Sequence, residues 1–499
     1  MRRSQNWIAA LGFMVAISIV YCANLQLGLG FWSSLPGWFW WRTEKPAEPQ
    51  GLALLAAGWI FAVSALQLAQ GRSTAHLARP ARDRARMVVV AVLVFGAALL
   101  FSFGHVLLEG RGLDPSRRYL AYVQGACLHS NPLAVIRYYE DIVRSEYWFG
   151  GFYRTKPPGL AAMYTIACNI ACGFPGPLPD HEGRMARTVD LLVWIWPLFS
   201  AASAVLVGLF TARISRPRSS RPSASRDRMD FALGGVLFAS TPAVGIVVMN
   251  ADQFLYPGLV ASSGLALVRA LDGGGTARGR AGSAALGAIW MWVFCFFHFS
   301  TLAAAAGLLG GAGLALAVRM VDRSVPRRET WRIAASLALT LCLVTVLAFV
   351  VLRYDPLMRY RDAMAAHIGW KGFTDTPRER AYWASIDLLE LSMTSGWPLA
   401  CLATFGAFSL LSEPRRWLRP QGALLLMPMV FLLAAAWVGK TKGETGRIWI
   451  FSLAFTVPLA VERLRAIAPR RLVLSASTVV GLQVVAAIFL KRYQDFRPH

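Results

Sequence analysis

Long apolar segments recur along the whole chain and are separated by short polar or charged stretches. Most of them have about the length at which a helix crosses a bilayer, and lipid offers no hydrogen-bond partner to a backbone in another conformation. The pattern therefore predicts an all-α polytopic membrane protein with about 13 transmembrane helices. The predicted spans are 7–29, 51–70, 87–108, 188–212, 231–249, 254–271, 282–298, 300–319, 332–352, 397–412, 421–438, 448–461 and 472–490.

One further apolar segment, 158–173, is short for a span. Arginine-rich loops follow every second span, and such loops favour the cytoplasm together with the N-terminus. A full crossing by 158–173 would place the basic loop 213–230 on the opposite side. We therefore predict that 158–173 is re-entrant or interfacial, and that the loops 109–157 and 353–396 lie on the outer face.

The composition agrees with a membrane protein and argues against a nucleic-acid-binding protein. The chain is 56% hydrophobic and 16% charged, whereas soluble domains have roughly 25% charged residues. The net charge of +24 comes from arginines that alternate with apolar spans. This distribution is typical of topology signals near anionic lipid headgroups and not of nucleic-acid binding.

The candidate chemistry centres on the sequence Tyr-Arg-Thr-Lys-Pro-Pro-Gly at 153–159, at the start of the short apolar segment. Proline favours the first turn of a helix and disfavours helix in the residue before it, so Lys156 should lie at a helix mouth. A lysine beside exposed backbone N–H groups suits a phosphate, and Arg154 is a second candidate. The preceding outer loop supplies carboxylates, among them Asp114 and Asp141.

The order of these motifs resembles that of the GT-C-type membrane glycosyltransferases, in particular the branch of protein O-mannosyltransferases and the lipid A aminoarabinose transferase. The matching stretches are the outer loop with Asp114, Lys156-Pro157-Pro158, the arginines of 183–187, Thr241-Pro242 before Asp252, and Glu444 with Arg447 in 443–449. The chain departs from the family pattern where members often have Asp-Glu, because it has Asp114-Pro115 instead.

The resemblance implies a GT-C-like fold in three regions. Residues 1–86 would hold two transmembrane helices and a basic cytoplasmic loop, 87–462 the catalytic core with its two outer loops, and 463–499 a basic loop, the last transmembrane helix and the tail. Such a protein would be integral to the bacterial inner (plasma) membrane, with its N-terminus in the cytoplasm.

The implied activity is transfer of a sugar from a polyprenyl-phosphate donor to a lipid, glycan or protein acceptor on the extracytoplasmic face. This chemistry needs a general base for the acceptor and positive groups for the departing phosphate. It requires no cofactor. No His, Asp or Glu cluster has metal-ligand spacing, so a divalent metal is neither required nor excluded.

Asp114 is the first candidate for the base and Asp141 the second. The candidate phosphate-binding residues are Lys156, Arg154, Arg184, Arg187, His298, Lys440, Lys442 and Arg447, and Asp252 and Glu444 are further site candidates. Each carboxylate also has a structural interpretation, as a turn or cap or as a solvated helix face. A lone histidine in a span is more often satisfied by a backbone or hydroxyl partner.

Two other functions share the membrane pattern. A transporter or lipid flippase would show internal repeats with matching broken helices, and no such self-similarity is visible in the sequence. An O-antigen ligase or polymerase would have its large loop late in the chain, where 353–396 is a candidate. The early Lys-Pro-Pro motif favours the mannosyltransferase-like branch.

Overall fold

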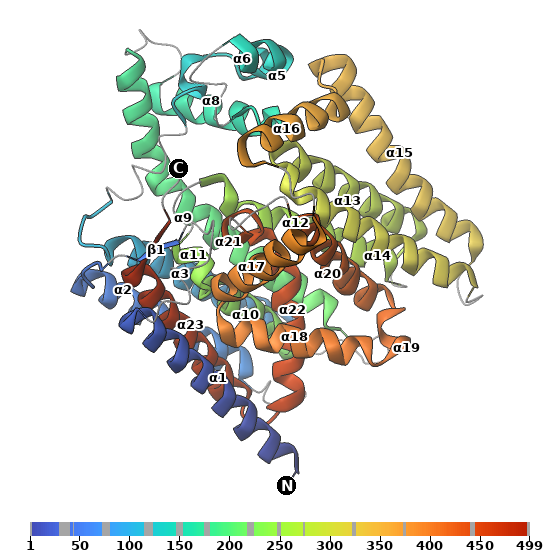
Figure 1. The fold of residues 1–499 in the computed structure, drawn as a ribbon. Coiled ribbons are helices and arrows are strands. Elements are labelled where there is room, and N and C mark those ends of the chain that lie inside the picture. Colours follow the sequence, from blue (N-terminus) through green and yellow to red (C-terminus); the bar gives the residue numbers. More distant parts are fainter. Residues whose placement is uncertain are drawn as a thin grey trace.

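The part of the chain that the structure describes is almost entirely helical (Figure 1). The structure is a computed structural model, and it describes residues 2–28, 40–42, 44–71, 80–113, 123–145, 153–173, 180–216, 224–246, 251–272, 275–321, 326–372, 376–439 and 445–496. This confirms the predicted all-α class for these residues.

Nine helices in the described ranges are long and apolar enough to cross a membrane. They are α1 (Arg2–Leu27), α2 (Pro49–Gln70), α3 (Pro80–Leu107), α9 (His181–Ile214), α13 (Ala277–Phe297), α14 (Leu302–Val321), α15 (Arg327–Leu352), α20 (Pro420–Val438) and α23 (Leu472–Tyr493). All nine coincide with predicted spans.

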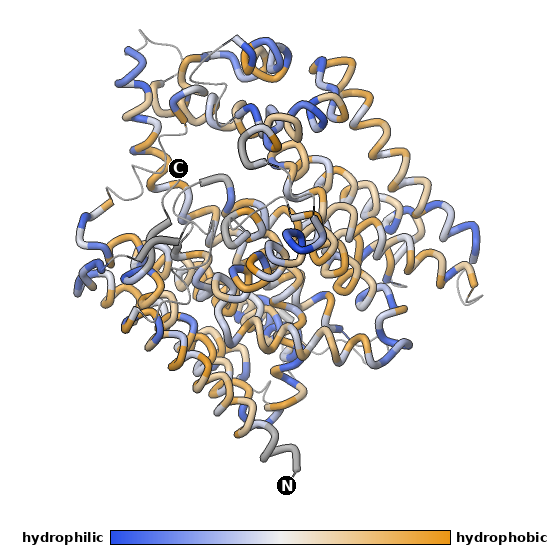
Figure 2. Tube along the Cα trace, in the orientation of Figure 1, coloured by the Kyte–Doolittle hydropathy of each residue, from blue (hydrophilic) through white to orange (hydrophobic). Residues whose placement is uncertain are grey.

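The surface of α15 is apolar and exposed over much of its length. Leu339, Leu343 and Val350 on this helix are 69%, 58% and 66% exposed. Figure 2 shows hydrophobic colour along most of α15, whereas α16 (Pro356–Lys371) has mixed colour. A contiguous apolar face of this size is stable only against lipid or another protein. Together with the nine apolar helices, it identifies an integral membrane protein.

The other four predicted spans are shorter or interrupted helices. They correspond to α10 (Ala224–Ala239) with α11 (Pro242–Ile246), α12 (Tyr256–Leu271), α18 (Trp397–Leu411) and α22 (Leu453–Ile467). Pro242 begins α11 after a break at Ser240 and Thr241, because proline cannot continue the preceding helix. The predicted number of 13 full spans is therefore not confirmed, since an apolar run need not form one continuous helix.

A sharp bend separates α17 (Pro377–Ser395) from α18. The two helices meet at 115°. Gly396 lies between them with a φ of +85°, a conformation that glycine adopts at little cost. The predicted outer loop 353–396 is thus mostly helix, formed by α16 and α17.

A group of short helices lies at one end of the molecule, at the top of Figure 1. It contains the 3-10 turn η2 (Ala126–Leu128), α5 (Pro132–Arg137), α6 (Tyr139–Ser145) and α8 (Pro158–Cys172). α8 begins at the predicted proline and has 15 residues, about 22 Å at the usual helical rise. This length is short for a full span, as predicted for 158–173, and α8 packs against α5, η2 and α9.

The ends of the chain pack onto the core. α1 packs along α23, and α2 packs along α3. Two short strands also pair in antiparallel fashion, β1 (Trp40–Arg42) with β2 (Gln494–Phe496). The remaining short elements are η3 (Ala251–Phe254), η4 (Phe299–Thr301), α19 (Pro414–Trp417), α21 (Thr445–Ile448) and η5 (Ile450–Ser452).

The fold leads to a prediction about topology. If α8 does not cross the bilayer, the loops before and after it lie on the same side. Ser130 and Glu182 are both exposed, so Ser130→Cys and Glu182→Cys should react with a membrane-impermeant thiol reagent from the same side. An Arg470→Cys variant, in the basic loop before α23, should react from the other side.

The labelling is measured in intact cells and in inverted vesicles, with the native cysteines replaced. Reaction of positions 130 and 182 from opposite sides would show that α8 crosses the membrane.

Candidate functional site

The turn at 153–156 has the local structure that its prolines dictate. The Lys156 N–H donates to the Tyr153 carbonyl oxygen at 2.8 Å. Pro157 is extended, with φ −77° and ψ 164°, and α8 begins at Pro158. Proline has no N–H to leave unpaired in the first turn of a helix, which is why the helix begins here. The predicted position of Lys156 at a helix mouth is confirmed.

A buried tyrosine holds this turn from α6. The Tyr139 hydroxyl donates to the Tyr153 carbonyl oxygen at 2.9 Å and lies 3.3 Å from the Lys156 carbonyl oxygen. Tyr139 is 2% exposed, and burial raises its pKa well above the usual value. The phenol therefore stays protonated at neutral pH and remains a donor.

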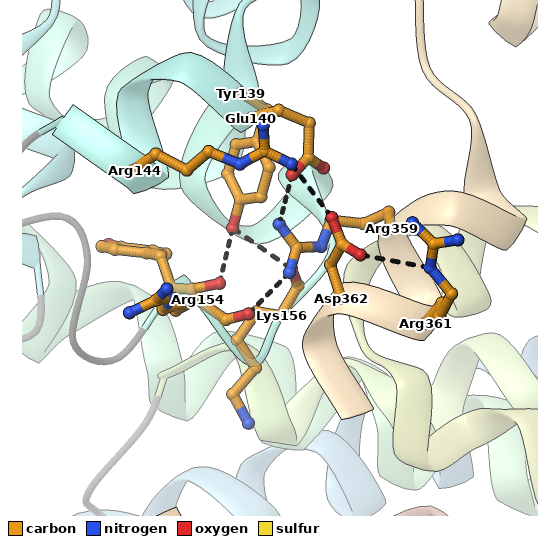
Figure 3. A network of polar contacts seen from close by, with 9 residues as sticks. Tyr139, Glu140, Arg144, Arg154, Lys156, Arg359, Arg361 and Asp362 are labelled. Atoms are coloured by element: carbon orange, nitrogen blue, oxygen red, sulfur yellow. Dashed lines mark hydrogen bonds and ion pairs between the residues drawn. The ribbon is translucent and has the colours of Figure 1, made fainter. Parts of the chain in front are cut away.

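A buried arginine from α16 completes the support (Figure 3). The Arg359 guanidinium donates to the Glu140 carboxylate at 2.9 Å and to the Arg154 carbonyl oxygen at 2.8 Å. It also lies 5.7 Å from the centre of the Tyr139 ring. Because Arg359 is only 2% exposed, these contacts are shielded from water and tie α6, α16 and the turn together.

The Lys156 side chain leads away from this support toward the end of α13. Its Nζ lies 2.7 Å from His298 Nε2. His298 Nδ1 accepts from the Ser300 N–H at 3.1 Å and lies 2.7 Å from Ser300 Oγ. Since a backbone N–H can only donate, Nδ1 carries the lone pair, and the neutral ring has its proton on Nε2.

With Lys156 protonated and His298 in the tautomer that Ser300 selects, both atoms of this contact are donors. An ammonium has no lone pair, and Nε2 is protonated in the tautomer that Ser300 selects. An anionic oxygen beside the pair would accept a hydrogen bond from each nitrogen. This property is what a site for a phosphate requires.

Close helix packing makes this contact possible. A Cβ added at Gly159 would come 2.4 Å from the Phe296 carbonyl oxygen. The absence of a side chain at Gly159 thus lets the first turn of α8 lie against the last turn of α13. Lys156 precedes the first of these turns, and His298 directly follows the second.

The segment with Arg447 reaches the same place. Ser300 Oγ lies 3.3 Å from the Ile448 carbonyl oxygen, at the end of α21. α21 is held at its other end by α17, where the Asp387 carboxylate accepts from the Thr445 hydroxyl at 2.5 Å and Glu390 accepts from the Thr445 N–H at 3.2 Å. Both carboxylates are 0% exposed.

Sequence reasoning missed Arg359, Asp387 and Glu390. A signal for the two carboxylates exists, because they lie three residues apart and so share one face of a helix. Nothing local marks Arg359, whose partners Glu140 and Arg154 are more than 200 residues away in the chain.

The other predicted site residues fall into three groups. Asp141, Arg154 and Arg187 are exposed. Asp114, Lys440, Lys442 and Glu444 lie outside the described residues, and only the backbone is described for Asp252 and Arg447. Of the predicted site residues, the structure places Lys156 and His298 in contact, beside the backbone of α21.

Arg184 has a different environment. It is buried and donates to the His129 carbonyl oxygen at 3.1 Å. Arg184 is also close enough to the Cys168 thiol to act on it electrostatically. Cys168 is three turns along α8 from Lys156, roughly 18 Å at the usual rise. Arg184 supports the backbone before α5, and its role in phosphate binding stays a prediction.

A second buried cluster of charges lies between the ends of α3 and α23. The Glu109 carboxylate is 2.7 Å from Lys491 Nζ and 3.7 Å from Lys45 Nζ. Burial acts to raise the pKa of Glu109, but the two ammonium groups outweigh it and hold this pKa below its usual value. The carboxylate is therefore charged at neutral pH and joins the two ends of the chain.

The described residues contain no group of three or more His, Cys, Asp or Glu side chains that could hold a metal ion. No family model matches the chain, and no curated protein or solved structure matches it. The chemistry of the site therefore has to be inferred from its own residues.

The packing of α8 on α13 gives a prediction for Gly159→Ala. The new methyl group would overlap the Phe296 carbonyl oxygen, so the helices must separate, and we expect a loss of about 1–3 kcal/mol in stability. The matched control is Gly282→Ala in α13, where an added Cβ meets nothing within 4 Å. The measurement is thermal unfolding of both variants in the same detergent. Equal stability of the two variants would contradict the close approach.

Proposed function

We propose that the chain is a membrane glycosyltransferase that takes its sugar from a polyprenyl-phosphate donor. The observation that carries the proposal is the pair of donor groups, Lys156 Nζ and His298 Nε2, which lie 2.7 Å apart at the mouth of α8. A phosphate oxygen that contacts both groups would accept from each, and positive or donor groups at a departing phosphate stabilise the transition state of transfer.

The surroundings of the pair suit a donor that has a charged head and an apolar tail. The head would meet Lys156 beside the first turn of α8, where backbone N–H groups add to the positive potential. Tyr256, whose ring centre lies 5.5 Å from that of His298, forms an aromatic wall beside the pair. The tail would remain among the apolar helices that face lipid.

The proposed transfer needs a base for the acceptor and positive groups for the departing phosphate. The acceptor loses a proton from its hydroxyl or amine to a carboxylate base, its oxygen or nitrogen forms the new bond to the anomeric carbon, and the bond from that carbon to the phosphate oxygen breaks. The phosphate leaves with the bonding electrons and gains charge, which Lys156 and His298 stabilise. Asp114 is the first candidate for the base.

Asp141 is the second candidate for the base. It lies on α6, beside Glu140 and Tyr139, which connect this helix to Arg359 and to the 153–156 turn. Asp141 is therefore on an element whose position relative to Lys156 is fixed. The motif order in the sequence, with its resemblance to GT-C-type enzymes, supports the same reaction class.

Binding of a polyprenyl phosphate tests the donor part of the proposal. We expect Lys156→Ala to weaken binding by about 2–5 kcal/mol, because it leaves phosphate charge without its partner. His298→Ala should also weaken binding. The double variant should lose less than the sum of the two, because both residues contact one phosphate.

The affinities are measured for purified protein in one detergent, with Arg361→Ala as the control, since Arg361 is 79% exposed and pairs with the neighbouring Asp362. Strict additivity would show separate sites. Unchanged affinity in all three variants would remove both residues from phosphate binding.

Replacement of the base tests the transfer itself. We expect Asp114→Asn to lower the rate by about 10²–10⁴, because the amide keeps the shape of the side chain and cannot take a proton. The rate is followed as release of polyprenyl phosphate from a panel of polyprenyl-phosphate sugars in membranes that supply acceptors. If Asp114→Asn is active and Asp141→Asn is not, the base is Asp141; if both retain the wild-type rate, neither carboxylate is the base.

A further inference from the structure

A groove of about 440 Å³ lies far from this site, between α1, α18 and α22. Its walls are apolar except for one arginine. The lining residues are Ala9, Ala10, Phe13, Met14, Cys401, Leu402, Phe405, Arg463, Ala466 and Ile467. Phe13 and Phe405 are 53% and 51% exposed, so the groove opens toward the surroundings of the molecule.

The arginine in the groove differs from its charged neighbours on α22. Glu462 pairs with Arg416, and Arg465 pairs with the buried Asp230 at 2.7 Å. Arg463 instead lies 6.0 Å from the centre of the Phe405 ring. Among the described residues, no carboxylate pairs with Arg463, so its positive charge is not neutralised by an ion pair within this part of the protein.

The groove lies near the end of the molecule that carries the N-terminus. Arg463 is within about one turn of the end of α22, and Arg470 and Arg471 follow in the next turn. Ala9, Ala10 and Phe13 belong to the first half of α1. This arrangement places Arg463 close to the depth at which phospholipid headgroups meet the apolar core of a bilayer.

We propose that this groove binds an anionic glycerophospholipid, with the phosphate on Arg463 and an acyl chain against Phe13 and Phe405. The guanidinium offers two parallel N–H donors that match phosphate oxygens. The apolar walls take the chain, and the unpaired charge selects a lipid with net negative charge over a zwitterionic one. The proposal needs only that the protein is in a membrane and does not rest on the glycosyltransferase function.

The site would hold α1 against α18 and α22. α1 packs mainly on α23 and has fewer contacts with α18 and α22, so a lipid in the groove fills the space between them. A bound anionic lipid should therefore stabilise the protein as well as remain attached during purification.

The test uses purified full-length protein with dioleoyl phosphatidylglycerol, and dioleoyl phosphatidylcholine as the zwitterionic comparison. Retained lipid is counted by native mass spectrometry, and thermal unfolding is measured with each lipid. We expect wild type to prefer the anionic lipid about fivefold, the effect of one arginine near an anionic headgroup. Arg463→Gln should remove the preference.

Two further variants distinguish lipid binding in the groove from nonspecific attraction of an anionic lipid to positive charge. Ala10→Phe fills the groove and keeps every charge, so it should also lose the bound lipid. Arg470→Gln removes a nearby exposed arginine that does not line the groove, and it should bind as wild type does. A wild type without preference, or an Arg463→Gln variant that keeps it, would overturn the proposal. If Arg463→Gln does not fold, the proposal is overturned when Ala10→Phe still retains as much anionic lipid as wild type.

Discussion

The geometry of the candidate site depends on the close approach of two helix ends, the start of α8 and the end of α13. Gly159 has no side chain where a Cβ would overlap the Phe296 carbonyl oxygen. This contact brings Lys156 to His298, although the two are 142 residues apart in the chain. Arg359 and Tyr139 then fix the turn that carries Lys156, because they donate hydrogen bonds to its carbonyl groups.

Much of the fold is predictable from hydrophobic periodicity, because lipid allows few backbone conformations. Nine predicted spans match long apolar helices. The errors have local physical causes. Pro242 interrupts the predicted span 231–249, and Gly396 allows the 115° bend before α18. α22 runs to Ile467, past its predicted end at 461, and Arg465 in this extension pairs with Asp230 on α10.

The candidate site is only partly predictable. The prolines place Lys156 at a helix mouth, and this can be inferred from the sequence alone. His298 is visible as a polar residue in an apolar run, but its contact with Lys156 depends on tertiary packing. The roles of Arg359, Asp387 and Glu390 also depend on partners far away in the sequence, and no short-range pattern encodes such contacts.

The central claim is that Lys156 and His298 together bind the phosphate of a lipid-linked sugar donor. A cryo-electron microscopy structure of the protein in nanodiscs with a polyprenyl phosphate tests it most directly. We predict a phosphate oxygen within about 3.2 Å of both Lys156 Nζ and His298 Nε2, with the two groups moved apart to admit it. A bound phosphate elsewhere, with the contact between Lys156 and His298 unchanged, would contradict the account.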